Sequence, residues 1–279
     1  MDFQWYPGHM TKAKRMMQEN MKLIDIMIEL VDARIPLSSR NPDIDQLAAN
    51  KSRLILLNKT DMADERVTAQ WEEYFKEKGF YVARTNARSG KGVKGTQAIV
   101  MDACKEKLER DRKRGIKNRP IRAMIAGIPN VGKSTFINSL VGKACTKTGN
   151  KPGVTKGKQW IRLNKSVELL DTPGILWPKF EDQEVGMRLA YIGSIKDDIL
   201  NIEELALQEF YPAAIRERYN VEEELKPLDI LTAVAKARGC LKKGEELDYE
   251  KASRLLLEEF RSGKLGKVTL EFPKGPEEV

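Results

Sequence analysis

Short apolar runs alternate with longer polar or amphipathic stretches from residue 24 to about residue 175. The short runs have the length of buried strands, and the apolar spacing between them is typical of helices. The predicted strands are 24–31, 53–57, 80–85, 121–126, 159–163 and 167–170. The predicted helices are 43–50, 64–78, 91–113 and 132–141. This alternation predicts an α/β domain whose helices cover a mainly parallel, six-stranded sheet.

The pattern changes after Trp177 and Pro178. Predicted strands stop, and helical spacing takes over in the segments 202–209, 228–237 and 249–261. We therefore expect two domains, an α/β domain over 1–178 and a smaller all-helical domain over 179–279. The segment 272–279 contains two prolines and is expected to be loose.

The composition indicates a globular protein of a reducing compartment. Of the 279 residues 41% are hydrophobic and 32% are charged, which is enough for a core and excludes a disordered or fibrous chain. No apolar run approaches the roughly 18–20 residues of a membrane span, and the first residues have no apolar signal-peptide core. Cys104, Cys145 and Cys240 lie far apart, which favours the cytoplasm, and with His9 as the single histidine a His-based zinc site is not expected.

The net charge of +8 is distributed unevenly. Residues 1–178 carry a net charge of +14, and residues 179–279 carry −6. The first segment could attract a polyanion such as RNA, although basic domains without nucleic-acid partners also exist. The last segment would need a local basic patch for the same purpose. The densest basic run, 105–122, has nine basic and three acidic residues and is expected to be a solvated helix face and linker.

A phosphate-binding motif follows the predicted strand 121–126. Residues 127–134 read GIPNVGKS and match G-x-x-x-x-G-K-[ST] between a predicted strand and a predicted helix. In such a loop, backbone N–H groups and the helix start surround phosphate oxygens. Lys133 is expected to reach the β- and γ-phosphates of a nucleotide, and Ser134 to bind Mg²⁺. Further nucleotide contacts are expected from Asn130, Val131, Gly132 and Thr135.

Two further phosphate-side features lie downstream. Residues 171–174 read DTPG and match D-x-x-G at the end of the last predicted strand. There Asp171 is expected to hold Mg²⁺ and the Gly174 N–H to meet the γ-phosphate, whereas a DTPG sequence alone would be a strand-ending turn. The loop 151–158 is rich in Gly and Lys, and Thr155 within it is either a hydroxyl ligand for Mg²⁺ or part of an ordinary polar turn.

A base-binding motif follows the predicted strand 53–57. Residues 58–61 read NKTD and match N-K-x-D. Asp61 can accept hydrogen bonds from both the ring N–H and the exocyclic amine of guanine, and adenine offers no such pair. Asn58 is expected to tie this loop to the base and to the phosphate-binding loop. The stem of Lys59 is expected to cover the ring face.

The turn 85–88 after the next strand resembles, in degenerate form, the S-A-K turn whose backbone N–H meets the guanine oxygen. This makes Asn86 and Ala87 candidate base contacts. Most GTPases place the phosphate motifs first and the base motifs after them, whereas here both base motifs come first. The set is thus cyclically rotated. A parallel sheet tolerates this rotation if a surface linker joins the old ends, and 105–122 is expected to be that linker.

With these motifs, the chain resembles the circularly permuted GTPases, specifically the ribosome biogenesis GTPase A (YlqF-like) family. The resemblance also covers the helical segment, and its motifs are WYPGHM at 5–10, DARIP at 32–36, NKTD at 58–61, GIPNVGKST at 127–135, PGVT at 152–155 and DTPG at 171–174. It implies a Mg²⁺-dependent cytoplasmic GTPase that binds the large ribosomal subunit precursor and its rRNA and promotes late maturation. Neither a membrane nor DNA is expected as a partner. The helical domain resembles an RNA-binding module, whose best candidate surface is Lys236, Arg238, Lys242 and Lys243.

Turnover is expected to be slow unless ribosomal particles stimulate it. Many GTPases have a glutamine after D-x-x-G to orient the attacking water, and here 175–177 read ILW. The resemblance points instead to His9, although His9 could also be a structural residue beside Trp5 and Tyr6. With Lys133, Thr155 and Gly174, His9 completes the expected catalytic set.

Asn130 matches the position that helps to bind a monovalent cation such as K⁺ in related GTPases. It could equally be a loop residue without that role.

Two other functions stay open. The first is a nucleotide-gated ribosome-binding module with negligible catalysis, which the missing glutamine favours. The second is a GTPase coupled to RNA modification, although 179–279 shows no additional catalytic constellation.

Overall fold

The computed structural model describes residues 8–116, 119–143, 159–177, 180, 182–207, 212–219 and 226–273. The chain divides into two compact units. The first is an α/β unit that contains the described residues of 4–180 together with 269–273, and the second is a helical unit within 181–268.

The α/β unit is built on one six-stranded sheet with the order β3-β2-β1-β4-β6-β5. Its strands are β1 (Ile26–Asp32), β2 (Ser52–Asn58), β3 (Tyr81–Arg84), β4 (Ile121–Ala126), β5 (Gln159–Arg162) and β6 (Val167–Asp171). Neighbours pair in parallel except β5, which is antiparallel to β6. The prediction of a six-stranded, mainly parallel sheet is confirmed, and each strand ends within two residues of its expected bounds.

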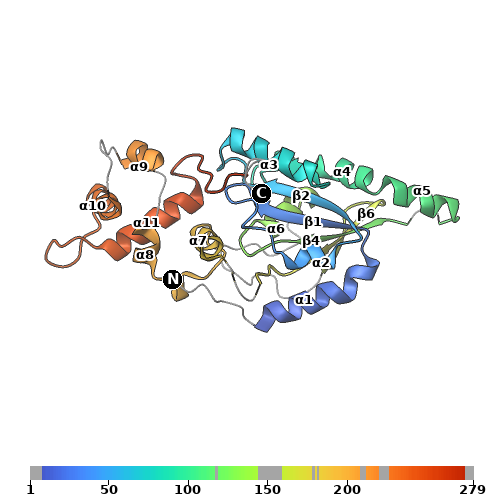
Figure 1. The fold of residues 1–279 in the computed structure, drawn as a ribbon, viewed down its shortest axis with the longest axis horizontal. Helices are drawn as coiled ribbons and strands as arrows, with labels where there is room; N and C mark the ends of the chain where they lie inside the picture. Colours follow the sequence, from blue (N-terminus) through green and yellow to red (C-terminus); the bar gives the residue numbers. More distant parts are fainter. Residues whose placement is uncertain are drawn as a thin grey trace. The chain divides into compact units, whose positions relative to one another are not determined.

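Helices lie on both sides of this sheet (Figure 1). They are α1 (Gly8–Asn20), α2 (Asp43–Leu47), α3 (Glu65–Glu77), α4 (Thr96–Ala103), α5 (Lys105–Lys113) and α6 (Lys133–Val141). In Figure 1, α3, α4 and α5 follow one side of the sheet, and α1 and α2 lie on the other. All seven residues of β1 are buried, as a central strand covered on both faces requires.

The prediction of a single helix over 91–113 is wrong. Gly92 has a φ of 77°, so the chain turns there and the first helix begins only at Thr96. The helical path is interrupted again at Cys104 (φ −105°, ψ 8°), and α5 begins after it. Helix α1 had no counterpart among the predicted elements.

Helix α3 fixes the segment that follows the base motif. The Asp64 carboxylate caps the helix by accepting from the backbone N–H groups of Arg66 and Val67. On its buried side, Trp71 and Phe75 pack in one cluster with β1 and β2 residues. The end of β2 is therefore held between a strand pair and a capped helix.

The described residues of the second unit form helices, as expected. They are α7 (Gln183–Tyr191), α8 (Ile202–Leu207), α9 (Pro212–Tyr219), α10 (Pro227–Arg238) and α11 (Tyr249–Ser262), together with a short 3₁₀ turn. Helices α7 and α9 were not predicted. The buried Glu259 carboxylate of α11 accepts hydrogen bonds from Arg218, Tyr219 and Arg238, so one anion joins α9, α10 and α11. Among the described residues no helix combines the length and apolar character that a membrane span needs.

The chain returns to the α/β unit after Val268. The sequence placed 269–271 in the helical domain, whereas the structure groups them with the α/β unit. The reason is a set of hydrogen bonds, because the Leu270 N–H donates to the Arg34 carbonyl oxygen at 2.8 Å and Trp71 Nε1 donates to the Glu271 carbonyl oxygen at 2.9 Å. We call residues Thr269–Glu271 the strap.

Candidate nucleotide site

The phosphate-binding loop joins β4 to α6, as predicted from the motif. Gly132 has a φ of 102°, and a Cβ there would lie 2.6 Å from Asn58 Nδ2, so two separate constraints demand glycine. Ser134 and Thr135 stand in the first turn of α6 and are half-buried. Asn130 has a φ of 61°, a left-handed conformation that asparagine tolerates better than most residues. The loop thus has the shape that brings backbone N–H groups toward an anion.

Lys133 is buried at the start of α6. Its Nζ donates to the carbonyl oxygens of Gly127, at 3.0 Å, and of Ile128, at 3.4 Å. Burial lowers the pKa of Lys133 to about 8, against the opposing charge of Asp171. The two carbonyl oxygens hold the Lys133 ammonium group inside the loop, at the place expected for a phosphate ligand.

The D-x-x-G segment lies directly beside this lysine. A Cβ on Gly174 would lie 2.9 Å from the Pro129 backbone nitrogen and 3.1 Å from Lys133 Nζ. The Ile175 N–H donates to the Gly127 carbonyl oxygen at 3.3 Å. Gly174 therefore contacts the phosphate-binding loop, and a larger residue would force the two segments apart.

Asp171 at the end of β6 is the candidate Mg²⁺ ligand. It is fully buried, and among the described residues neither carboxylate oxygen has a hydrogen-bond partner. Burial raises the pKa of Asp171 to about 6, against the opposing effects of Lys133 and of the Thr172 backbone. A buried carboxylate without a partner costs folding free energy unless a cation binds to it. The residues present thus fit a hard divalent cation such as Mg²⁺.

Asn58 at the end of β2 joins three segments. Its Nδ2 donates to the Val131 carbonyl oxygen at 2.9 Å, and its Oδ1 accepts from the Ala87 N–H at 3.0 Å and from Thr85 Oγ1 at 3.2 Å. These bonds tie the base motif both to the phosphate-binding loop and to the turn after β3. The carboxyl ends of parallel strands bring such loops together.

Lys59 and Thr60 of the base motif bond to neighbouring protein groups, whereas Asp61 is exposed. Lys59 has a φ of 60° and donates from Nζ to Asp32 Oδ2 at 2.9 Å. Thr60 Oγ1 donates to the Thr85 carbonyl oxygen at 3.2 Å. Asp61 is exposed, which leaves its carboxylate accessible to a base.

The turn at 85–88 is closed by its own hydrogen bonds. Asn86 Oδ1 accepts from the N–H groups of Arg88 and Ser89, both at 3.0 Å, while the Ala87 N–H donates to Asn58. Asn86 is thus the residue that shapes the turn, as serine and asparagine side chains do in short turns.

Two predicted site residues, His9 and Thr155, have side chains that the structure does not describe. His9 belongs to α1, and its side chain is not described. Thr155 and its loop 151–158 lie outside the described residues.

Sequence reasoning missed one charged group of the site. Asp32 ends β1 and accepts a hydrogen bond from Lys59. Although it belongs to the DARIP motif, that motif predicted no role for it in the site. Its position could have revealed it, because Asp32 ends a buried strand just as Asn58 and Asp171 do.

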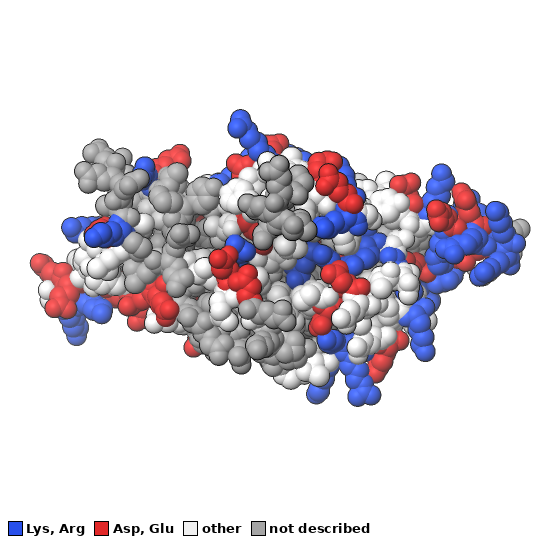
Figure 2. Space-filling view, in the orientation of Figure 1, with Lys and Arg blue, Asp and Glu red and all other residues white. Residues whose placement is uncertain are grey.

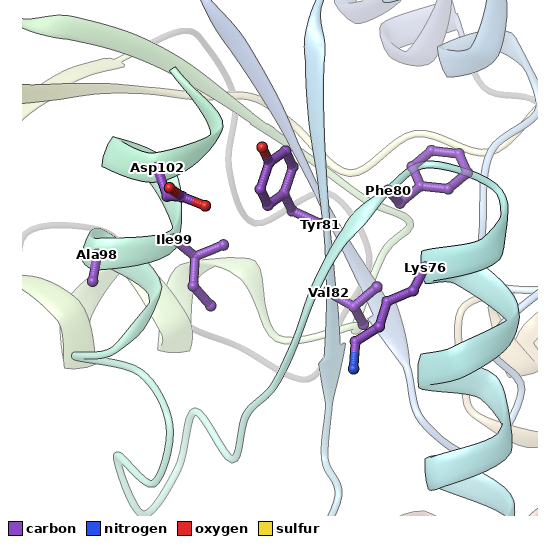
Figure 3. Close-up of a pocket in the computed structure, with 7 residues that line it drawn as sticks. All are labelled: Lys76, Phe80, Tyr81, Val82, Ala98, Ile99 and Asp102. Atoms are coloured by element: carbon purple, nitrogen blue, oxygen red, sulfur yellow. The ribbon is translucent and has the colours of Figure 1, made fainter. Parts of the chain in front are cut away.

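A shallow pocket of about 510 Å³ lies beside the start of β3 (Figure 3). Its lining residues come from the end of α3, the start of β3 and α4: Lys76, Phe80, Tyr81, Val82, Ala98, Ile99 and Asp102. None of them belongs to a nucleotide motif. Because β3 begins at Tyr81, the pocket is at the amino end of the strands, away from the nucleotide loops.

Known proteins are similar to this chain in sequence and in fold. A ribosome biogenesis GTPase A of Bacillus cereus is 53% identical over 281 residues, which covers 98% of this chain and 95% of that protein. One of Priestia megaterium is 50% identical over 286 residues, which covers 100% and 99%. The crystal structure of GNP-bound YlqF from T. maritima matches with a TM-score of 0.69 and 30% identity, and the match covers 94% of this chain and 99% of that one.

This chain belongs to the ribosome biogenesis GTPase A family. It is a GTPase and binds GTP. Residues 122–235 also match the family described as "50S ribosome-binding GTPase". That match begins in β4, so the base motif of this GTPase lies before it, as the circular permutation requires.

Proposed function

We propose that this GTPase acts in the cytoplasm, where it binds the large ribosomal subunit precursor and its rRNA in the GTP state and promotes late maturation. Hydrolysis then releases it. The names of the relatives and the description of the matching family support a ribosomal partner. The observation that carries the nucleotide control is the contact of Gly174 with Pro129 and Lys133, because the chain runs from there into the helical unit.

Within the site, each residue keeps the role that its chemistry favours. Asp61 selects guanine, and Lys133 binds the β- and γ-phosphates. Mg²⁺, when bound, neutralises developing phosphate charge, and Asp171 would hold it with Ser134 and Thr155.

Slow intrinsic turnover follows from the residues after D-x-x-G. Ile175 and Leu176 are apolar and buried, so neither can orient a water molecule. We assign that role to His9, and we assign Asn130 to a K⁺ ion that would add positive charge near the phosphates.

Two basic surfaces are available for rRNA. Of the four residues expected to form a patch on the helical unit, Arg238 bonds to Glu259 and lies over the Tyr219 ring, so Lys236, Lys242 and Lys243 remain. The second surface is the end of α5, where Figure 2 shows Lys and Arg side chains gathered. Its exposed basic residues are Arg110, Arg112, Lys113 and Arg114. Such clusters attract phosphate backbones without reading sequence.

The test is co-sedimentation of the chain with large-subunit precursor particles at one fixed salt concentration. A non-hydrolysable GTP analogue should give tighter association than GDP, and Gly174→Ala should remove the difference, because its Cβ would meet Pro129 and Lys133. Equal association with both nucleotides in the unmodified chain contradicts the proposal.

Turnover provides the second readout. Particles should raise GTP hydrolysis, more in K⁺ than in Na⁺, and His9→Ala should lower the stimulated rate while GTP affinity stays near normal. Unchanged stimulated turnover in His9→Ala would return this histidine to a structural role.

A further inference from the structure

The Asp32 carboxylate is a buried hub beside the base motif. It is 0% exposed and lies at the end of β1. Oδ1 accepts from Arg34 Nε at 2.9 Å, and Oδ2 accepts from an Arg34 terminal nitrogen at 2.8 Å and from Lys59 Nζ at 2.9 Å. Burial alone would raise the pKa of Asp32, but the charges of Arg34 and Lys59 outweigh it and hold the pKa well below its usual value. Asp32 is therefore a permanent anion that fixes the end of the Lys59 side chain.

Arg34 is locked in the same way. Its guanidinium forms a fork on one carboxylate, and both side chains are at most 1% exposed. A bidentate arginine-carboxylate pair of this kind has little freedom to rotate. The position of Lys59 thus depends on the backbone that carries Arg34.

The strap holds that backbone. The Arg34 carbonyl oxygen accepts from the Leu270 N–H at 2.8 Å. The Glu271 carboxylate accepts from the backbone N–H groups of Leu37, at 2.6 Å, and Ser38, at 3.0 Å, and from Ser38 Oγ at 2.6 Å. Glu271 is only 6% exposed, so these charge-assisted bonds form out of water, where they are strong.

The other end of the strap reaches the segment behind the base motif. The backbone N–H of Asp64 donates to Thr269 Oγ1 at 2.9 Å, and Asp64 follows Asp61 by three residues. The strap thus contacts both the loop after β1 and the segment that follows the base motif. It is also continuous with the helical unit, because Val268 is the last residue of that unit.

We propose that the strap Thr269–Glu271 is a positioning element of the guanine site, which sets the place of Lys59 through Arg34 and Asp32. The inference rests on the proposed role of Lys59 in base binding. Asp32 and Glu271 are positioning residues that act through Lys59. Because the strap directly follows the helical unit in the chain, a partner whose binding displaces this unit changes guanine-nucleotide affinity, and linkage requires the reverse effect of equal size.

The test measures GDP affinity of the full chain by titration calorimetry, with inorganic triphosphate and Mg²⁺ as a ligand that has no base. Asp32→Asn and Lys59→Met should each weaken GDP roughly ten- to hundredfold, as expected for loss of a charge-assisted hydrogen bond. The double variant should be no weaker than the worse single variant, because both changes break one linkage. Triphosphate affinity should stay unchanged in all of them.

Glu271→Gln tests the strap itself. Because it leaves the buried Asp32–Arg34 pair intact, it still tests the proposal if Asp32→Asn fails to fold. It should weaken GDP several-fold but not triphosphate, and Ser38→Ala should do the same to a smaller extent. The control is Glu258→Gln, an exposed glutamate of α11. GDP affinity equal to that of the control, or triphosphate weakened as much as GDP, would overturn the proposal.

These outcomes separate two failures. If the unmodified chain binds ADP as well as GDP, the base site itself is wrong. If it prefers GDP and the strap variants behave as the control does, only the positioning role is wrong.

Discussion

At the ends of β1 and β2, the polar side chains of the base-binding half bond to other protein groups, whereas at the end of β6 the buried carboxylate of the phosphate-binding half does not. Asn58 makes three hydrogen bonds, and Asp32 pairs with both Arg34 and Lys59. Asp171 has no hydrogen-bond partner among the described residues. Internal hydrogen bonds thus satisfy the buried side chains of the base half, whereas in the phosphate half the Asp171 carboxylate is left for the Mg²⁺ ion and the nucleotide that we propose to bind there.

The largest expected effect comes from Lys133→Ala. It removes the buried charge beside Gly127 and Gly174, so GTP affinity and turnover should each fall by about a hundredfold or more, as when one preorganised donor is lost from a dry site. The ratio of GDP to ADP affinity should survive, because the base half is untouched. Lys143→Ala, an exposed lysine after α6, is the control. A lost guanine preference in Lys133→Ala would mean that the halves are not separate.

Asn58→Ala probes the base half. It leaves the buried Ala87 N–H and the Val131 carbonyl oxygen without their partner, so the nucleotide-free chain should lose about 2 kcal/mol of unfolding free energy. Urea unfolding measures this loss, with exposed Asn50→Ala as the control. Stability equal to that of the control would show that the base half is not held by these bonds.

Asp171→Asn should change the unfolding free energy less than Asn58→Ala does, and in the opposite direction. Removing a buried, unpartnered charge should raise the unfolding free energy of the metal-free chain by roughly 1 kcal/mol. In the same variant, GTP affinity should depend less on Mg²⁺, because Ser134 and Thr155 would remain as proposed ligands. The control is Asp102→Asn, which is exposed on α4. A destabilisation as large as that of Asn58→Ala would place Asp171 among the internally bonded residues and remove the contrast.

The sequence could place the motif residues near one another because they lie at strand ends or just beyond them. Asn58 and Asp171 end strands, and Lys133 begins the helix that follows β4. A parallel sheet brings such strand ends together whatever the order of its strands along the chain. The rotated motif order could therefore be resolved without coordinates.

The strap could not be predicted from sequence. Glu271 and Ser38 are separated by 233 positions, and no local pattern links an acidic residue near the end of the chain to a loop after β1. The break of the helix at Cys104 and the presence of α1 were also missed, since local propensity decides neither when tertiary packing dominates.

Amide hydrogen exchange of the nucleotide-free chain, compared with the chain bound to GTP analogue and Mg²⁺, tests the contrast between the two halves most directly. Local opening sets the exchange rate, so segments held by internal bonds are protected before any ligand arrives. The account predicts that peptides covering 54–61 and 85–87 are already protected without nucleotide and change little. Peptides covering 127–134 and 171–175 should gain protection only when nucleotide and Mg²⁺ are both present. Equal gains of protection in the two sets of peptides would contradict the account.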